Sequence, residues 1–533
     1  MHTSQLWRRL LALLFAFSVV AAACGSSDDT TAAGGEDGET EANEEAGGIS
    51  SDDAEEALSN DDDEPEDEEA MEDEEPEEVM AEPQNIEELE AFWAENRQNV
   101  VDAIVAGGYG VNDDNILMGP SGMAVDLNDC PADWSNTEGV GDTVKIGNTT
   151  VFSGNLAAYG NITVGMGLYY DYINATHGGI DGVPIELIAK DDGYVATVTI
   201  ELVDELLQSD KPFAIETLGS PNSLAVYDTL NTNCVPHPFT VTGHPAWGDP
   251  VNHPWTTPMQ MSYATEAVLW GAWIKANMAD QLPVTVAGLV MDNDFGLAYE
   301  DGMQKYADAN PDVVSDFTAV RHDPAAPTVT NEMTTIASED PDVFISMTAG
   351  NPCLLAVEEA GRAGLTDGET VLFAPSVCKD PNSFMIPAGE VANDWLIIGG
   401  GLKAFTDPQY ADDPFISFAN NLMVEGGEDP TVGLLGTGFN FAWPMVEALR
   451  IAAGLDGGLN RTNFMLAQRA MDITNPMLLD GISFSLDGNE DAYFIEGSEI
   501  SRYDSAAESW IQEGDVVDLN GSSPPCNWTD TGC

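Results

Sequence analysis

The sequence predicts an α/β protein with two doubly wound parallel-sheet lobes that are joined by several crossings of the chain. Three observations lead to this fold class. From residue 142 onward, short apolar runs alternate with amphipathic segments, a rhythm typical of a parallel sheet with helices on both faces. The rhythm restarts after a helical stretch at residues 263–278. Segments near the end of the chain then have to return and complete the lobes.

Runs of β-branched and other apolar residues predict the strands of the first lobe. They cover residues 143–151, 184–190, 212–215 and 235–241. Apolar residues at helical spacing predict the helices between them, at residues 157–175, 195–208 and 222–230.

The same signals predict the second lobe. Its strands are expected at residues 285–291, 313–320, 343–347 and 370–374, and its helices at 296–309, 328–338 and 353–363. Helices are also expected at 415–423 and 432–453, and short antiparallel strands at 481–486, 492–495 and 500–503.

The charge of the chain excludes one class of partner. The 533 residues include 93 Asp and Glu but only 16 Lys and Arg, which gives a formal net charge of −77. Such a polyanion is repelled by nucleic-acid phosphates and by anionic lipid surfaces. We therefore expect no nucleic-acid partner.

The beginning of the chain has the three parts of an export signal. Arg8 and Arg9 precede an apolar run at 10–20, and small residues precede Cys24. The sequence around Cys24 resembles the lipobox of bacterial lipoproteins, which implies a signal peptide at 1–23 and a lipid anchor on Cys24. The expected location is the outer face of the cytoplasmic membrane, in the periplasm or at the cell surface. The anchor would be the only membrane contact.

An acidic segment follows the anchor. Residues 24–85 are mostly Gly, Ser, Ala and acids, so they cannot bury a core and are expected to form a disordered tether. Within the segment 86–141, residues 86–106 predict an amphipathic helix that packs on the first lobe.

Cysteine usage fits an oxidising compartment. Apart from Cys24, the chain has an even number of cysteines: Cys130, Cys234, Cys353, Cys378, Cys526 and Cys533. In an exported chain this predicts three disulfides, with fifteen possible pairings. None lies in a CxxC pair or at zinc spacing with His, so no metal is expected.

Candidate binding residues follow the predicted strands, because ligands of doubly wound sheets bind beyond the carboxyl ends of the strands. Small hydroxyls, amides and helix N-termini at these places suit a small polar or anionic ligand. Helix capping alone explains any single Ser or Asn equally well, but it does not explain Tyr159. The candidates are Ser153, Tyr159, Ser220, Pro221, Thr240, Thr242, Asp294, Phe295, Ala349, Asn351 and Ser376.

The segment KIGNTTVFSGNLAAYGNITVGMGLYYDYINATHGGIDGVPIELIAKDDGY resembles the opening of type I periplasmic solute-binding proteins related to the branched-chain amino-acid receptors of ABC transporters. The resemblance extends over roughly residues 142–515. It implies two lobes that close on a small molecule, three hinge crossings, permease subunits as partners, and no cofactor. It places lobe 1 at 142–262 plus about 392–474, lobe 2 at 263–391 plus about 475–515, and a tail at 516–533.

The resemblance also implies roles for single residues. Tyr159 would pack on the ligand, while Ser220 and the segment 240–242 would hold its carboxylate or equivalent polar head. Amino-acid binders place an acid where this chain has Ser376, and an aromatic residue near 349–351, so the ligand itself is not identified. Asp294 could replace that acid, although capping the helix that follows is favoured for it.

The resemblance also ranks the disulfides. Cys353 with Cys378 and Cys130 with Cys234 are favoured, which leaves Cys526 with Cys533.

The predicted function is an extracytoplasmic receptor of an ABC importer that binds a small polar or amino-acid-like molecule. One alternative is a sensing ectodomain for a signalling partner, which uses the same lobes. A less favoured alternative is a hydrolase of small amides with a histidine among His237, His244 and His253. The sequence contains no nucleophile elbow, HExxH or P-loop, so no enzyme activity is expected.

Overall fold

The computed structural model of the chain describes residues 48–58, 83–132, 134, 140–529 and 532–533. The expected signal peptide, Cys24 and most of the acidic tether lie outside the described residues. All described residues belong to one unit of the chain, residues 43–533.

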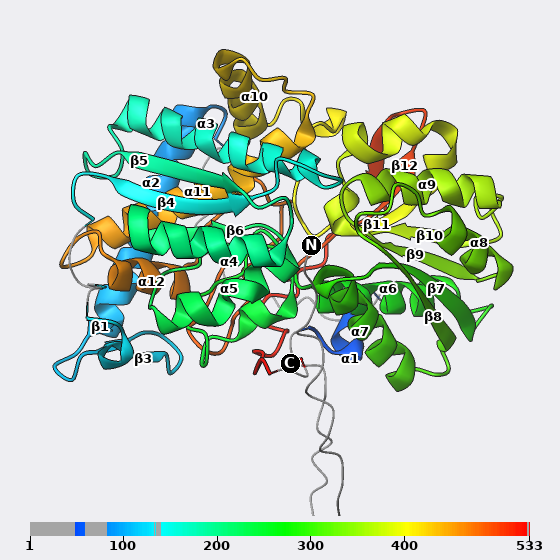
Figure 1. The fold of residues 1–533 in the computed structure, drawn as a ribbon, viewed down its shortest axis with the longest axis horizontal. Helices are drawn as coiled ribbons and strands as arrows, with labels where there is room; N and C mark the ends of the chain where they lie inside the picture. The colour runs from blue at the N-terminus through cyan, green and yellow to red at the C-terminus, as the bar shows by residue number, and fades with distance from the viewer. Residues whose placement is uncertain (1–47, 59–82, 133, 135–139, 530–531) are drawn as a thin grey trace, which may run out of the picture. The chain divides into compact units, whose positions relative to one another are not determined.

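Lobe 1 is built on a parallel sheet in the order β5-β4-β6. Its strands are β4 (Val144–Thr150), β5 (Ile185–Asp191) and β6 (Ala214–Thr217), and its first helices are α3 (Gly160–His177), α4 (Ala196–Glu205) and α5 (Ser220–Thr232). Helices α4 and α5 pack on each other, while α3 packs against the later helix α11. This lobe occupies the left half of Figure 1.

Lobe 2 contains a seven-stranded sheet in the order β13-β12-β11-β10-β9-β7-β8. Strands β7 (Val284–Met291), β8 (Val314–His322), β9 (Val343–Met347), β10 (Val371–Ala374) and β11 (Leu396–Ile398) are parallel, whereas β12 (Ile500–Asp504) and β13 (Ser509–Gln512) extend one edge antiparallel. Its helices are α6 (Tyr263–Asn277), α7 (Asp294–Ala309), α8 (Thr330–Ser338) and α9 (Asn351–Ala363).

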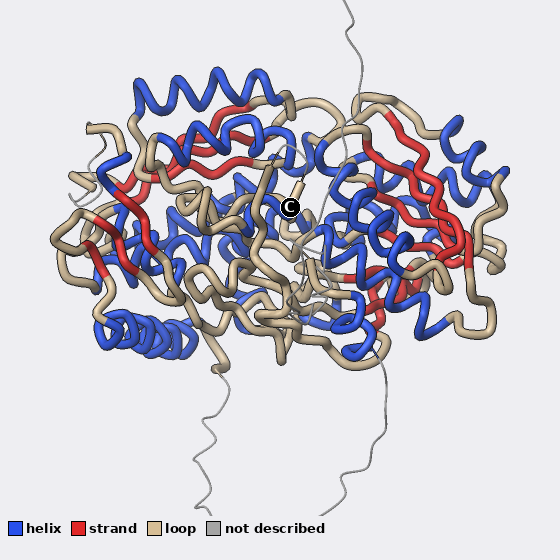
Figure 2. Tube along the Cα trace, turned by 90° about the horizontal axis from the view of Figure 1, so that it is seen from below, coloured by secondary structure: helices blue, strands red, loops and turns tan. Residues whose placement is uncertain are grey.

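The chain returns to lobe 1 after β11 and to lobe 2 before β12. The returning helices of lobe 1 are α10 (Pro414–Gly426), α11 (Gly433–Gly454) and α12 (Arg461–Arg469). The chain therefore crosses between the lobes before α6, after β11 and before β12. Figure 2 shows the strands in two groups, with loops and helices between them.

Glycines allow α3 and α11 to approach closely. A Cβ on Gly165 would lie 1.9 Å from the Leu435 carbonyl oxygen, and one on Gly438 would lie 2.2 Å from the Ile162 carbonyl oxygen. Neither distance is possible for a real side chain, so only glycine fits at both positions. Gly165 of α3 and Gly438 of α11 therefore serve helix packing.

Part of the expected tether is ordered, which corrects the prediction of disorder over residues 24–85. Residues Ser51–Leu58 form helix α1, which packs on α6. Ile49 and Ala54 are fully buried, and Glu55 pairs with Lys275. The few apolar residues of this stretch thus suffice to cover one helix face.

Helix α2 (Ile86–Gly107) packs on lobe 1, as its amphipathic pattern predicts. The Asn85 side chain caps its first turn, and Gly108 ends it with φ of 66°. Trp93 is buried edge-on between Phe415 and Trp443. A small antiparallel sheet follows, formed by β1 (Gly110–Val111), β2 (Ile116–Met118) and β3 (Ala124–Asp126).

Three expected strands do not form. Residues 235–241 make only isolated bridges, at His237 and Val241, because Pro236 and Pro238 lack the N–H groups that a ladder needs. The expected strands at 481–486 and 492–495 are also replaced by loops. There the bridge between Asp487 and Asp491 closes a tight turn instead of a ladder.

The structure contains the disulfides Cys130–Cys234, Cys353–Cys378 and Cys526–Cys533. These are the pairings that the family resemblance favoured. Within the described residues, no helix is both long enough and apolar enough to cross a lipid bilayer.

The contact between α3 and α11 generates a test. Gly165→Ala should lower the free energy of unfolding by about 1–3 kcal/mol, because the new methyl group overlaps the Leu435 carbonyl. The matched control is Gly167→Ala in the same helix, where the nearest atom would lie 3.7 Å away. That variant should be neutral, or more stable by up to about 1 kcal/mol. Equal losses in both variants, measured by denaturant unfolding, would contradict the packing described here.

Candidate ligand-binding site

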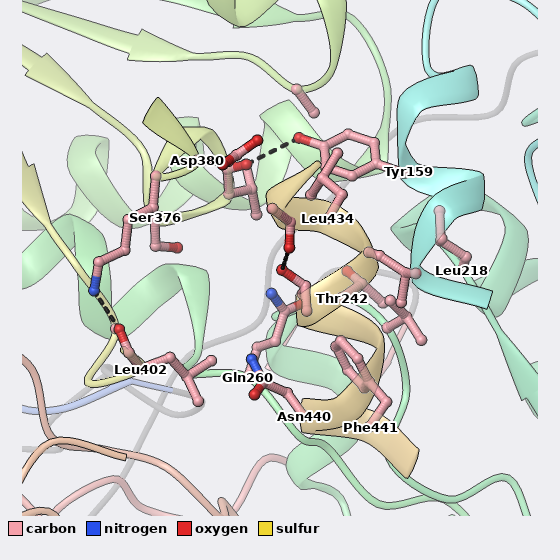
Figure 3. Close-up of a pocket in the computed structure, with 18 of the residues that line it drawn as sticks. Tyr159, Leu218, Thr242, Gln260, Ser376, Asp380, Leu402, Leu434, Asn440 and Phe441 are labelled. Carbon is pink, nitrogen blue, oxygen red and sulfur yellow. Dashed lines mark hydrogen bonds between the residues drawn. The ribbon is translucent and has the colours of Figure 1, made fainter. Parts of the chain in front are cut away.

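A cavity lies between the lobes, beyond the carboxyl ends of the strands (Figure 3). Its volume of about 120 Å³ approaches the roughly 150 Å³ of an engineered apolar cavity that binds benzene. The cavity therefore has room for one ring or a short branched chain. Its apolar walls are Leu156, Ile162, Leu218, Val241, Met261, Phe295, Leu402, Phe405, Leu434 and Phe441.

The structure brings five of the eleven candidate residues to this cavity. They are Tyr159, Thr242, Phe295, Ala349 and Ser376. Their position agrees with a binding role, and contact with a ligand stays a prediction for each.

Six candidates do not line the cavity: Ser153, Ser220, Pro221, Thr240, Asp294 and Asn351. Ser220 is buried directly behind Thr242, with 2.7 Å between the two hydroxyl oxygens. Thr240 is buried and its hydroxyl donates to the Thr257 carbonyl, while Ser153 is exposed beside Asp191. Pro221 occupies the first turn of α5.

Asp294 does not take its expected capping role. Helix α7 begins at Asp294 itself, and the side chain of Asn293 accepts the hydrogen bonds from the N–H groups of Phe295 and Gly296. Asn293 has the extended backbone of an N-cap, which a residue inside the helix cannot adopt.

Tyr159 connects the two lobes across the cavity. It stands at the N-terminus of α3 in lobe 1. Its hydroxyl donates to the Val377 carbonyl at 3.0 Å and accepts from the Gly350 N–H at 3.0 Å, both in lobe 2. Burial raises the pKa of Tyr159 above its ordinary value, so the phenol stays protonated and keeps its donor.

Backbone groups at the rim add to this bridge. The Asn155 side chain in lobe 1 donates to the Pro324 carbonyl at 3.0 Å. The backbone carbonyl of Asn155 accepts from the Asn351 N–H at 3.2 Å. Gly350 has φ of 67°, a conformation that favours glycine, and a Cβ there would lie 3.1 Å from the Asn155 carbonyl. The lobes are therefore in direct contact, in a closed arrangement.

Glu266 of α6 is a buried acid behind the cavity that the sequence analysis missed. Its carboxylate accepts hydrogen bonds from the Ser376 N–H, the Ser376 hydroxyl and the Tyr299 hydroxyl, each at 2.7 Å. Burial raises the pKa of Glu266 to about 7. Its signal in the sequence is an acid in the first turn of a largely apolar helix.

Three charged residues line the cavity without having been predicted. Lys379 pairs with Glu499, and Lys403 pairs with Asp413 at 2.8 Å. Asp380 accepts from the side chains of Ser383 and Thr406. Burial raises the pKa of Asp380, and the hydrogen bonds that it accepts from neutral groups only partly oppose this shift.

Neutral polar groups complete the lining. Asn440 of α11 is only 3% exposed, and its side-chain oxygen has no hydrogen-bond partner in the described part of the chain. Gln260 and Tyr194 also line the cavity. Figure 3 shows Thr242, Gln260 and Asn440 grouped on one side of it, opposite Asp380 and Ser376.

The three histidines considered for catalysis do not line the cavity. Burial lowers the pKa of His237 and of His244 to about 3. His253 lies between Asp249 and Asp228 and stacks on Tyr227. Over the described ranges, no group of His, Cys, Asp and Glu is arranged to hold a metal ion.

Comparison with known proteins agrees with this geometry. Residues 143–489 match a family model described as periplasmic binding protein. No curated protein matches the sequence.

Solved structures with the same fold are distant in sequence. A fatty acid ABC transporter substrate-binding protein from Thermomonospora curvata is 17% identical, with a TM-score of 0.61 over 75% of this chain and 97% of that one. A branched-chain amino acid ABC transporter from Thermus thermophilus with bound valine is 16% identical, with a TM-score of 0.62 over 71% of this chain and 97% of that one. A solute-binding protein from R. palustris in complex with benzoate is 18% identical, with a TM-score of 0.57 over 70% of this chain and 96% of that one. At these identities the likeness concerns the fold.

The Tyr159 bridge predicts the behaviour of a variant. Tyr159→Phe keeps the ring but removes the hydroxyl, so the closed arrangement loses two hydrogen bonds of about 1 kcal/mol each. The distance between a spin label on α4 and one on α8 should shift toward longer values. Tyr172→Phe, which removes a hydroxyl from α3 near Phe418, is the control. An unchanged distance distribution in Tyr159→Phe would contradict the bridge.

The raised pKa of Glu266 predicts a dependence of stability on pH. A carboxyl with a folded-state pKa of about 7 and an ordinary value of 4.5 stabilises the fold fully below pH 4.5, and this contribution is lost as the pH rises through 7. The loss amounts to about 3 kcal/mol at most. Glu266→Gln should flatten the fall in unfolding free energy between these pH values. Glu201→Gln, at an exposed position of α4, should leave the slope unchanged, and equal slopes in all three proteins would refute the assignment.

Proposed function

We propose that this chain, which belongs to the periplasmic binding protein family, is the solute-binding receptor of an ABC importer. The receptor binds a small polar molecule in the cavity between its lobes and presents the closed form to permease subunits. A lipid anchor on Cys24 would hold it at the outer face of the cytoplasmic membrane.

One observation carries the proposal. The cavity is lined from both lobes, and the same loops that line it make the direct contacts between the lobes. Tyr159 belongs to both sets, since its ring lines the cavity and its hydroxyl bonds Gly350 and Val377. Occupancy of the cavity and closure of the lobes are therefore coupled through one side chain.

The coupling follows from population shift. A ligand that touches both lobes binds the closed state more tightly than the open state, so it shifts the equilibrium toward closure. No covalent step is needed. The neighbours described above, with fatty acid, valine and benzoate in their names, indicate that this fold serves transport of chemically different solutes.

A thermal-shift screen tests the proposal. The full chain is mixed with amino acids, amides, sugars, urea and small carboxylates, each at millimolar concentration. A ligand at 1,000 times its dissociation constant adds about 4 kcal/mol, which should raise the midpoint by several degrees. A shift confined to one chemical group, without product in the mixture, is the expected outcome.

A pair of variants locates the binding. Thr242→Val changes a cavity wall and should reduce the shift strongly, whereas Thr335→Val, at an exposed position of α8, should preserve it. A shift that survives in Thr242→Val would place the ligand elsewhere. If nothing in the panel shifts the midpoint and native mass spectrometry finds no molecule carried through purification, the receptor assignment fails.

A further inference from the structure

We infer that the ligand of this cavity donates hydrogen bonds, as an amide or an amine does, and carries no carboxylate. The inference rests on the receptor function proposed above and narrows its ligand class. It rests on the charged side chains and the unpartnered acceptors at the cavity.

The positive charges at the cavity are already satisfied. The Lys379 ammonium contacts the Glu499 carboxylate and the carbonyls of Gly399 and Leu402. The Lys403 ammonium contacts Asp413 and the Pro476 carbonyl, at 2.8 and 3.1 Å. Lys379 has three acceptors and therefore no donor left, whereas Lys403 has two acceptors and keeps one N–H. One carboxylate already neutralises each lysine, so neither offers an unpaired positive charge to an anionic ligand.

The negative charges are not satisfied in the same way. Asp380, which lines the cavity, and Glu266, behind Ser376, accept hydrogen bonds only from neutral groups of the described chain. The donors to Asp380 are Ser383, Thr406 and the Asn382 N–H, and those to Glu266 are Ser376 and Tyr299. A ligand carboxylate would bring a further negative charge beside these two in a poorly solvated site, where like charges repel strongly.

The positive end of helix α5 already has an anion near it. Helix N-termini attract carboxylates, and α5 points its first turn toward the cavity wall at Gly219. The buried carboxylate of Asp192 lies 2.8 Å from the Asn222 side chain in that turn. Asp192 bonds side chains beside this helix end, namely Asn222 and Thr199, and not the N–H groups of its first turn. A ligand carboxylate at the start of α5 would therefore lie near a second buried acid.

Two acceptors in the cavity require donors from the ligand. The Asn440 side-chain oxygen is buried without a partner, and leaving it so is costly. The Ser376 hydroxyl gives its proton to Glu266, so the lone pairs of its oxygen remain to accept. An amide or ammonium nitrogen supplies such donors, and a carboxylate supplies none.

The charge of the whole chain acts in the same direction. A net charge of −77 repels anions on approach and favours neutral or cationic solutes, more so at low salt.

Matched compounds test the inference by isothermal titration calorimetry on the full chain at pH 7.5. One set is benzamide, benzylamine and benzoate, and the other is 3-methylbutanamide, 3-methylbutylamine and 3-methylbutanoate. In at least one set, the amide or the amine should bind 100-fold or more tightly than the acid. Comparable or tighter binding of the acids overturns the inference, and so does the absence of binding by every amide and amine.

Failure here remains distinct from failure of the receptor assignment. A carboxylate found by the thermal-shift screen keeps the receptor function and overturns only the ligand class.

Variants separate the charge from the donor requirement. Asp380→Asn should lower the ratio of amine to amide affinity at least tenfold, because it removes the negative charge that favours the amine. The exposed Asp412→Asn should leave that ratio unchanged. Asn440→Ala should weaken the bound amide about tenfold while circular dichroism stays native. An unchanged ratio of amine to amide affinity in Asp380→Asn would show that Asp380 does not contribute to ligand selection.

Discussion

The scarcity of cations constrains the whole structure, because 16 lysines and arginines have to serve 93 carboxylates. Several of these cations form ion pairs with acids where separate segments of the chain pack together. Arg97 of α2 and Arg450 meet at the buried Glu447 of α11, so they fasten the N-terminal helix to lobe 1. Lys379 and Lys403 are paired where the chain crosses between the lobes. The acids around the cavity are left to neutral donors, which sets its electrostatic character.

Much of the fold could be predicted from the sequence because its parallel strands and helices have local signals. The strand at Val343–Met347 is a buried apolar run, and α7 and α9 repeat apolar residues at helical spacing. The elements that were missed lack such signals. Strand β11 has only three residues, and α12 is buried on all sides although its sequence is polar, since Arg461 and Arg469 donate to backbone carbonyls.

The candidate site was predictable only where it lies at strand ends. Tyr159, Thr242 and Ser376 follow strands or their extensions, so the rule for doubly wound sheets finds them. Glu266 and Asn440 belong to helices that reach the cavity only after the lobes assemble, and Lys379 and Asp380 lie beyond a strand in a short irregular turn. No local pattern encodes these approaches. The charge balance of the cavity is therefore a property of the tertiary structure.

The Cys353–Cys378 disulfide has a consequence for the motion of the lobes. It joins the first turn of α9 to the turn after β10. Next to these two cysteines lie the backbone groups that bond the Tyr159 hydroxyl, at Gly350 and Val377. The covalent link keeps the Gly350 N–H and the Val377 carbonyl in place relative to each other even while the lobes are apart. Closure then loses little conformational entropy in these loops and can proceed as a rigid-body rotation. Formation of this disulfide would thus prepare the acceptor site of Tyr159 before any solute arrives.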